Sequence, residues 1–119
     1  MALGLILLYI NLQNEEAYLD PLTKLYNRSY LLHHVDHMAR QAKKGRQTVG
    51  IMLDIDDFKQ INDTYGHSEG DLVLRAVGGI LLRCVESHTV VVRYGGDEFV
   101  ILLENANLDQ IHAAQERIR

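Results

Sequence analysis

Two hydrophobic runs, separated by two glycines and two carboxylates, constrain the fold of this chain most strongly. The segment HTVVVRYGGDEFVILLE, residues 88–104, has the pattern of two buried strands on either side of Gly95 and Gly96. Glycine accepts the positive φ of a tight turn, so we expect a hairpin with strands at residues 88–94 and 98–104. Such an apolar hairpin predicts a sheet that other elements must cover.

Helical and strand patterns alternate along the rest of the chain. Apolar residues recur at helical spacing over residues 27–44, which end at Gly45, and over residues 71–85. We expect a buried strand at residues 47–55, a short helix within residues 58–63 before Gly66, and a last helix at residues 108–119 capped by Asn107. The two long apolar faces consist of Leu31, Leu32, Val35, Met38, Ala39 and Ala42, and of Leu72, Val73, Ala76, Val77, Ile80 and Leu81. These patterns predict an α/β (α+β) fold with helices on a mainly antiparallel sheet.

The N-terminal segment has its own character. Residues 2–10 are mostly apolar, but a membrane-spanning helix needs about 20 such residues. Two interpretations stay open, the end of a membrane helix or an amphipathic helix that pairs with a partner. Leu5, Leu8, Leu12 and Leu19 favour a short coiled-coil seam. Because Pro21 disfavours helix at Asp20, we place a boundary there, with a signalling helix at 1–19 and the globular domain at 20–119.

Charge and cysteine content exclude some classes of function. The chain has 119 residues with 12 Lys plus Arg and 16 Asp plus Glu, a net charge of −4, which argues against a nucleic-acid polymer as partner. The single cysteine, Cys84, lies in an apolar run and is expected to be a reduced, buried core residue. A cytoplasmic location fits this composition, with the parent protein anchored to the inner membrane as the alternative.

Two acidic clusters flank buried strands, Asp54 to Asp57 after one strand and Asp97-Glu98 before another. If the strands are neighbours, the carboxylates converge at one edge and repel one another unless a cation lies between them. Mg²⁺ prefers a few carboxylates together with phosphate oxygens of a substrate. The competing interpretation is that Asp56 and Asp57 only cap the next helix and that Asp97 and Glu98 are ordinary surface residues of a hairpin.

Three motifs together resemble the GGDEF family of diguanylate cyclases. They are DPLTKLYNR at residues 20–28, DIDDFKQINDTYGHSEGD at residues 54–71, and RYGGDEF at residues 93–99. The resemblance implies a palm-like, adenylyl-cyclase-like sheet flanked by helices. It also implies that two GTP molecules condense to cyclic di-GMP with release of two pyrophosphates, at the interface of a homodimer.

The resemblance also implies roles for individual residues. Asp54, the carbonyl of Ile55, Asp97 and Glu98 would hold Mg²⁺, with Mn²⁺ as the alternative ion. Asp97 would help to deprotonate the 3′-hydroxyl, Glu98 would support the metal, and Lys59 would stabilise phosphate charge. GTP would be bound by Asn62, His67, Asp71, Phe58, Gly95 and Gly96. Asn62 and Asp71 would read the guanine edge, because an amide donates and accepts while a carboxylate accepts from the N–H groups.

The chain departs from the family pattern at two places. The product-inhibition motif R-x-x-D is replaced by Glu86 and Thr89, so we expect feedback by product to be weak or absent. The family's later strands, final helix and phosphate-binding basic residues are expected beyond Arg119, so the domain is expected to be incomplete at its C-terminus. An upstream sensor or membrane segment is expected in the parent protein.

One alternative function stays open, a catalytically silent GTP-binding or dimerisation module. His33 and His37 lie one helical turn apart, a spacing that suits two ligands of one metal ion. However, no second group of ligands accompanies them in the sequence, and Leu31, Leu32 and Val35 supply the expected core face of this helix. We therefore expect no metal site at the two histidines.

Overall fold

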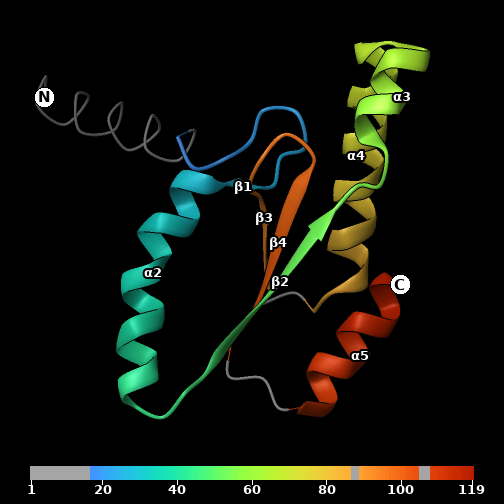
Figure 1. The fold of residues 1–119 in the computed structure, drawn as a ribbon. Coiled ribbons are helices and arrows are strands. Elements are labelled where there is room, and N and C mark those ends of the chain that lie inside the picture. The colour runs from blue at the N-terminus through green and yellow to red at the C-terminus, as the bar shows by residue number, and fades with distance from the viewer. Residues whose placement is uncertain (1–16, 87–88, 105–107) are drawn as a thin grey trace, which may run out of the picture.

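The computed structural model describes residues 17–86, 89–104 and 108–119 and has the order β-α-β-α-α-β-β-α (Figure 1). The elements are β1 (Tyr26–Asn27), α2 (Arg28–Lys43), β2 (Thr48–Asp54), α3 (Phe58–Tyr65), α4 (His67–Cys84), β3 (Val90–Arg93), β4 (Glu98–Glu104) and α5 (Leu108–Ile118). The helices and strands predicted between residues 27 and 119 are therefore present, with ends that differ by a few residues. The expected cap Asn107 and the N-terminal residues 1–16 lie outside the described residues.

The four strands form one sheet in the order β1-β3-β4-β2. The hairpin partners β3 and β4 are antiparallel, and β2 pairs antiparallel with β4 along its whole length. The short strand β1 pairs parallel with β3 and was not predicted, because its two residues merge with the helical pattern that follows. Leu19, the last position of the predicted seam, forms a bridge with Tyr26 instead of lying in a helix.

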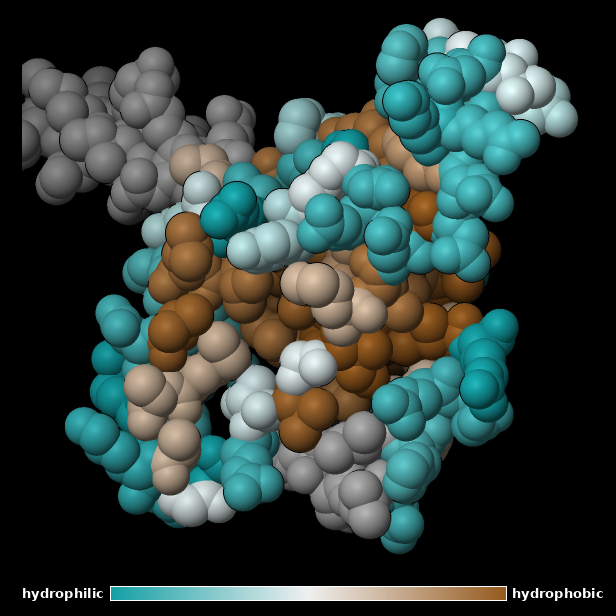
Figure 2. Space-filling model, viewed as in Figure 1, coloured by the Kyte–Doolittle hydropathy of each residue, from teal (hydrophilic) through white to brown (hydrophobic). Residues whose placement is uncertain are grey.

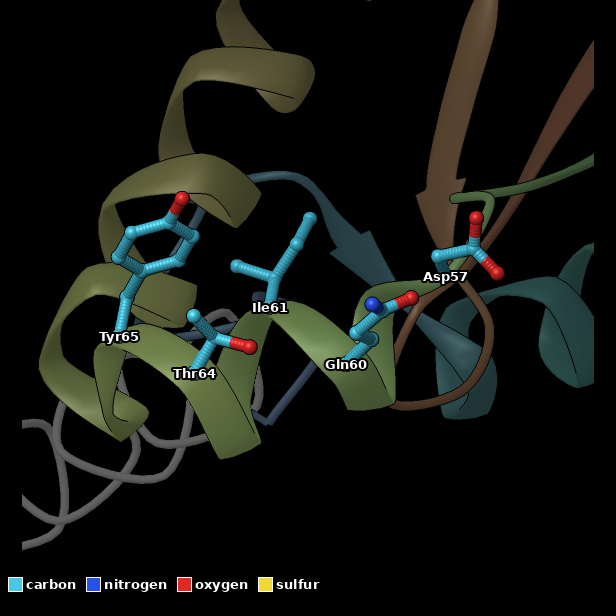
Figure 3. A pocket seen from close by; sticks show the side chains of 5 residues that line it. All are labelled: Asp57, Gln60, Ile61, Thr64 and Tyr65. Atoms are coloured by element: carbon cyan, nitrogen blue, oxygen red, sulfur yellow. The ribbon is translucent and has the colours of Figure 1, made fainter.

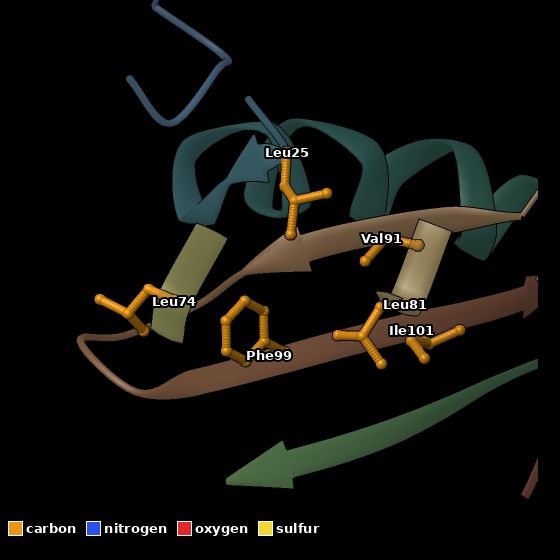
Figure 4. Packing of buried hydrophobic residues seen from close by; sticks show 6 residues of the cluster. All are labelled: Leu25, Leu74, Leu81, Val91, Phe99 and Ile101. Carbon is orange, nitrogen blue, oxygen red and sulfur yellow. The ribbon is translucent and has the colours of Figure 1, made fainter. Parts of the chain in front are cut away.

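Alternate residues of β3 and β4 point to two different cores. Val91, Phe99 and Ile101 join Leu25, Leu74 and Leu81 on the face covered by α4 (Figure 4). Val92, Val100 and Leu102 form the second core, on which Leu31 and Met38 of α2 pack. Burial on both faces explains why β4 is an uninterrupted hydrophobic run. The sheet is thus the middle layer between α2 and the α4–α5 pair, an α+β arrangement as predicted (Figure 1).

Helix α4 is longer than predicted, and its buried face overlaps the predicted one only in part, at Val77 and Leu81. It begins at His67 because Gly66, with φ 92°, ends α3 and starts α4. Its buried residues are Gly70, Leu74, Gly78 and Leu81, whereas the expected core residues Leu72 and Ile80 are 52% and 48% exposed. A Cβ on Gly78 would lie 3.4 Å from the side chains of both Thr23 and Leu25. The glycines therefore let the helix approach its neighbours closely, a contact that hydrophobic periodicity does not reveal.

Helix α2 has clear ends but no fully buried residue. The side chain of Asn27 caps it by accepting a hydrogen bond from the backbone N–H of Tyr30 at 3.0 Å, and Gly45 follows it with φ 81°. Leu32 and Val35, which were expected in the core, are 61% and 44% exposed. The sheet accepts only the Leu31 and Met38 side of the helix, so the predicted face is too wide.

The surface mixes hydrophobic and hydrophilic regions. Figure 2 shows hydrophobic side chains gathered over the centre of the molecule and hydrophilic ones over α3. Cys84 is half-buried rather than buried, and its thiol donates to the carbonyl of Arg117 at 3.6 Å, which links α4 to α5. None of the helices in the described part of the chain has the length and apolar character needed to cross a membrane.

Candidate functional site

The register of β2 and β4 brings the two acidic clusters together. Asp54, the last residue of β2, stands opposite Glu98, the first residue of β4. One residue further, the backbone N–H of Ile55 donates to the carbonyl of Asp97 at 3.2 Å. The sequence predicted this convergence on the condition that the strands are neighbours, and the sheet order meets that condition.

The carboxylates at this edge repel one another. A hydrogen bond with the Asp97 side chain and the charge of Asp97 raise the pKa of Asp54, with smaller contributions from burial and from the charges of Glu98 and Asp56. Asp54 is exposed, so its neighbours rather than burial dominate this shift. Such a cluster is relieved by a hard divalent cation with oxygen ligands. Asp54, Asp97 and Glu98 therefore suit Mg²⁺ by the chemistry of their donors.

The two glycines act differently from the way the sequence suggested. The hairpin across Gly95 and Gly96 is confirmed, but neither glycine has a positive φ, so the expected reason for glycine at this turn was wrong. Instead, the backbone N–H groups of Tyr94 and Gly95 both donate to the carbonyl of Glu98, at 2.8 and 3.2 Å. A Cβ on Gly95 would lie 3.2 Å from Oε1 of Glu98, whereas a Cβ on Gly96 would meet nothing within 4 Å. Gly95 thus makes room for the Glu98 carboxylate, and Gly96 leaves the backbone open on its outer side.

The acidic hairpin is anchored to the first motif. Arg93 donates from Nη1 to Oδ1 of Asp20 at 3.1 Å and from Nη2 to the carbonyl of Gly96 at 2.8 Å. Asp20 also accepts from the backbone N–H and the hydroxyl of Thr23, at 2.8 and 2.7 Å. The sequence offered only the motif match at these positions. No pattern along either element indicates the contact, because the two residues lie 73 positions apart and only the fold brings them together.

The segment between β2 and α3 turns sharply at Asp57. This residue has φ 58°, in the left-handed region, and its side chain makes no capping hydrogen bond at the start of α3. The competing interpretation, in which the side chain of Asp57 caps this helix, is therefore wrong for Asp57. The turn leads directly into Phe58, which packs against the main core, and Lys59, which is exposed on the first turn of α3.

The predicted guanine contacts lie where α3 meets α4. Asn62 is half-buried and faces Gly70, because a Cβ built on Gly70 would lie 1.8 Å from its Oδ1 and 3.4 Å from Cζ of Phe58. His67 and Asp71 are exposed on the first two turns of α4. Gly70 was not predicted as a site residue. A glycine in phase with Leu74 and Leu81 along an amphipathic helix is the signal that could have identified it.

A shallow cavity lies elsewhere on α3 (Figure 3). It has a volume of about 190 Å³ and is lined by Asp57, Gln60, Ile61, Thr64 and Tyr65. The predicted contacts Phe58 and Asn62 are not among its lining residues. The candidate site is therefore an open edge of the sheet with carboxylates, and it does not coincide with this cavity.

Comparisons with known proteins agree with this geometry. The family model described as "Diguanylate cyclase, GGDEF domain" matches residues 17–119. The chain is similar to the coiled coil and GGDEF domain of DgcB from Caulobacter crescentus in complex with c-di-GMP, with a TM-score of 0.89, 29% identity, and coverage of 99% of this chain and 62% of that one. It is also similar to the diguanylate cyclase SiaD from Pseudomonas aeruginosa in complex with its activator SiaC, with a TM-score of 0.83, 36% identity, and coverage of 99% and 46%.

Curated relatives include uncharacterized membrane proteins of Staphylococcus aureus, which are 39% identical over 108 residues. The match covers 90% of this chain and 30% of those proteins, so the chain spans about a third of their length.

Proposed function

The chain belongs to the diguanylate cyclase GGDEF domain family, and on that premise we propose that its protein condenses two GTP molecules into cyclic di-GMP. In each half of the reaction, the 3′-oxygen of one GTP attacks the α-phosphorus of the other. The bond from that phosphorus to the β-phosphate oxygen breaks, and pyrophosphate leaves. Two such steps close the ring and release two pyrophosphates.

One observation carries the proposal, the pairing of Asp54 with Asp97 and Glu98 at the ends of adjacent strands. This arrangement raises the pKa of Asp54 through the neighbouring charges, and it would be unfavourable without a cation. A structural module has no need of such repulsion. An enzyme that binds a metal–nucleotide complex does.

We assign the metal to Asp54, the carbonyl of Ile55, Asp97 and Glu98, with Mg²⁺ as the preferred ion and Mn²⁺ as the alternative. When bound, the metal would polarise the phosphoryl group and lower the pKa of the attacking hydroxyl. The carboxylates also exclude a free anion from this edge, so triphosphate binds only as its metal complex.

The remaining residues act on the nucleotide directly. Asp97 accepts the proton of the 3′-hydroxyl. Lys59, exposed on α3, places its ammonium charge beside the phosphates. Asn62 and Asp71 read the guanine edge, with His67 and Phe58 beside them, and the open backbone at Gly96 lets a phosphate approach.

The product has two equivalent linkages, whereas one site holds one GTP. Two copies of the site that face each other across a two-fold axis would supply both reacting groups in equivalent positions. We therefore propose that the active species is a homodimer and that the rate depends on protein concentration.

The test uses the protein expressed from its complete reading frame, incubated with GTP and Mg²⁺ at high protein concentration. Cyclic di-GMP and pyrophosphate should form in a ratio of one to two, and Asp97→Asn should abolish both. The absence of product would contradict the proposal. GTP binding measured in the same samples identifies the alternative, because a silent module would bind GTP without turnover.

A further inference from the structure

A second group of ligand-type side chains lies at the opposite end of the β2–β4 pair. Nitrogen atoms of His34 and His37 and a carboxylate oxygen of Glu104 all lie within 4.8 Å of one another. Glu104 stands opposite Thr48 in the register, six residues along β2 from Asp54. At about 3.3 Å per residue the two sites are about 20 Å apart, so this group is separate from the acidic edge.

Two elements of the fold bring the three side chains together. His34 and His37 are three residues apart on α2 and therefore lie on the same face, with ring centroids 5.0 Å apart. Glu104 is the last residue of β4, and its Oε1 contacts Nε2 of His34. The sequence suggested His33 as the partner of His37, but His33 is exposed and stacks on Tyr18 at 5.2 Å instead. The missing ligand was not visible in the sequence because it comes from a strand 70 positions away.

Aromatic packing holds the first of these imidazoles in place. The ring of Tyr30 stacks on His34 with centroids 5.5 Å apart and an interplanar angle of 15°, and Tyr26 stacks on Tyr30 at 3.8 Å. The side chain of His34 is 14% exposed and that of Glu104 is 30% exposed. His34 is thus oriented and largely screened from water, while the more exposed Glu104 leaves the group open to an ion.

We propose that His34, His37 and Glu104 form a binding site for a first-row transition-metal ion, with Zn²⁺ as the expected occupant. Two imidazole nitrogens and one carboxylate oxygen are ligands that zinc accepts at about 2.0–2.2 Å, whereas Mg²⁺ prefers oxygen ligands alone. A tetrahedral ion with such bonds holds its ligands about 3.4 Å apart, so small side-chain rotations from the observed spacing suffice.

The bound ion would cross-link α2 to the end of β4. These elements lie on different layers, and α2 buries none of its residues fully, so a metal bond adds a strong local tie between the helix and the sheet. Three protein ligands leave one tetrahedral position for water or an external donor. The site therefore connects the stability of α2 to the availability of zinc, independently of the proposed cyclase reaction.

The experiment measures Zn²⁺ binding to the untagged, full-length protein by isothermal titration calorimetry. Millimolar Mg²⁺ is present and the Asp97→Asn background is used, so that the acidic edge does not contribute. We expect one Zn²⁺ per chain, and we expect His34→Gln, His37→Gln and Glu104→Gln each to weaken binding at least about ten-fold. Co²⁺ bound in place of Zn²⁺ should give the visible absorption of a tetrahedral site, and the ligand variants should lose it.

His33→Gln is the matched control, since it removes a neighbouring exposed imidazole of the same helix. It should leave the affinity unchanged. Thermal unfolding in chelator shows whether each variant is folded before binding is compared, and Zn²⁺ should raise the melting temperature of the parent protein but not of a folded ligand variant. The proposal is overturned if the folded protein with only the Asp97→Asn background substitution binds no Zn²⁺. His34 and Glu104 would then form an ion pair only. It is also overturned if His33→Gln removes binding while His37→Gln keeps it.

Discussion

The guanidinium group of Arg93 contacts the carboxylate of Asp20 across 73 positions of sequence, with Nη1 to Oδ1 at 3.1 Å. The same side chain donates to the carbonyl of Gly96, so one residue joins the turn before β1 to the acidic hairpin. Both members of the pair are largely buried, with side chains 17% and 15% exposed. The contact therefore fixes the position of the hairpin that carries Asp97.

Replacing Arg93 should destabilise the fold. Arg93→Gln removes the charge and leaves the Asp20 carboxylate largely buried, which should lower the free energy of unfolding by about 2 kcal/mol. Arg119→Gln is the matched control, because Arg119 pairs with Glu116 at 3.5 Å on the surface. The side chain of Arg119 is 83% exposed and that of Glu116 is 73% exposed. That exposed pair should contribute less than about 0.5 kcal/mol. Urea unfolding of both variants measures the difference, and equal effects would contradict the assigned role of the Asp20 contact.

The effect of the same substitution should depend on pH. Burial alone would raise the pKa of Asp20, but hydrogen bonds from Thr23 and the charge of Arg93 outweigh it and lower the pKa below 3.8. A carboxyl group whose pKa is lowered by folding stabilises the folded state above its unfolded pKa, and this contribution is lost as the pH falls through the lowered folded value.

The difference in unfolding free energy between the parent and Arg93→Gln should therefore be constant above about pH 5 and shrink below about pH 4. Urea unfolding across that range measures it. In an Asp20→Asn background the effect of Arg93→Gln should no longer vary with pH. Persistence of the pH dependence in that background would assign it to another group.

Asp97→Asn should have opposite effects on stability and activity. The substitution removes a charge that raises the pKa of Asp54, so the metal-free protein should become more stable. Cyclic di-GMP synthesis should fall by at least about 100-fold, because the lost carboxylate serves both metal and substrate. Thermal unfolding in chelator and product formation with Mg²⁺ measure the two effects. Asp109→Asn, an exposed site on α5, should change neither.

Gly70→Ala should impair GTP binding without unfolding the protein. Its Cβ would lie 1.8 Å from Oδ1 of Asn62, so the amide has to rotate away from the proposed guanine contact. We expect the KM for GTP to rise by about ten-fold, the equivalent of one good hydrogen bond, with a smaller change in kcat. Gly79→Ala is the control in the same helix, since its Cβ meets only Arg83 Nη1 at 3.7 Å. It should leave KM unchanged and raise stability by up to about 1 kcal/mol.

Local patterns predicted most of the fold. Strand β4 coincides with the predicted residues 98–104, and Gly45 and Gly66 both mark the helix ends expected of them. The short strand β1 was missed because it depends on β3, which is distant in sequence. The early start of α4 was missed because its first turn, directly after Gly66, is polar and lies outside the apolar periodicity. The buried side of α4 was predicted only in part: Val77 and Leu81 pack in the core as expected, whereas the close approach at Gly70 and Gly78 was not foreseen.

The part of the candidate site that lies at strand ends could be predicted from the sequence. The convergence of Asp54 with Asp97 followed from two acidic clusters beside two buried strands. The Asp20–Arg93 contact and the ligand set of His34, His37 and Glu104 combine residues about 70 positions apart, and only the tertiary arrangement brings them together. Sequence patterns identify side chains by type and spacing along one element, but not across layers.

The protein should synthesise cyclic di-GMP without feedback by its product. In the family pattern an arginine and an aspartate precede the hairpin, and here Glu86 and Thr89 occupy their positions. The backbone N–H of Thr89 donates to the carbonyl of Glu86 at 2.9 Å, so both residues belong to one turn between α4 and β3. A carboxylate at position 86 repels a phosphate, whereas an arginine would bind it with two parallel hydrogen bonds.

Added cyclic di-GMP at about 50 µM, which would nearly saturate a site with a Kd of about 1 µM, should change the initial rate by less than about two-fold. The double substitution Glu86→Arg with Thr89→Asp restores the charges of the family pattern in the same turn, and it should make the rate fall as product is added. Strong inhibition of the parent protein at this concentration would show that product binds through other residues. An insensitive parent and an inhibited double variant together would assign the loss of feedback to the residues at positions 86 and 89, which share one turn through the Thr89 N–H to Glu86 carbonyl hydrogen bond.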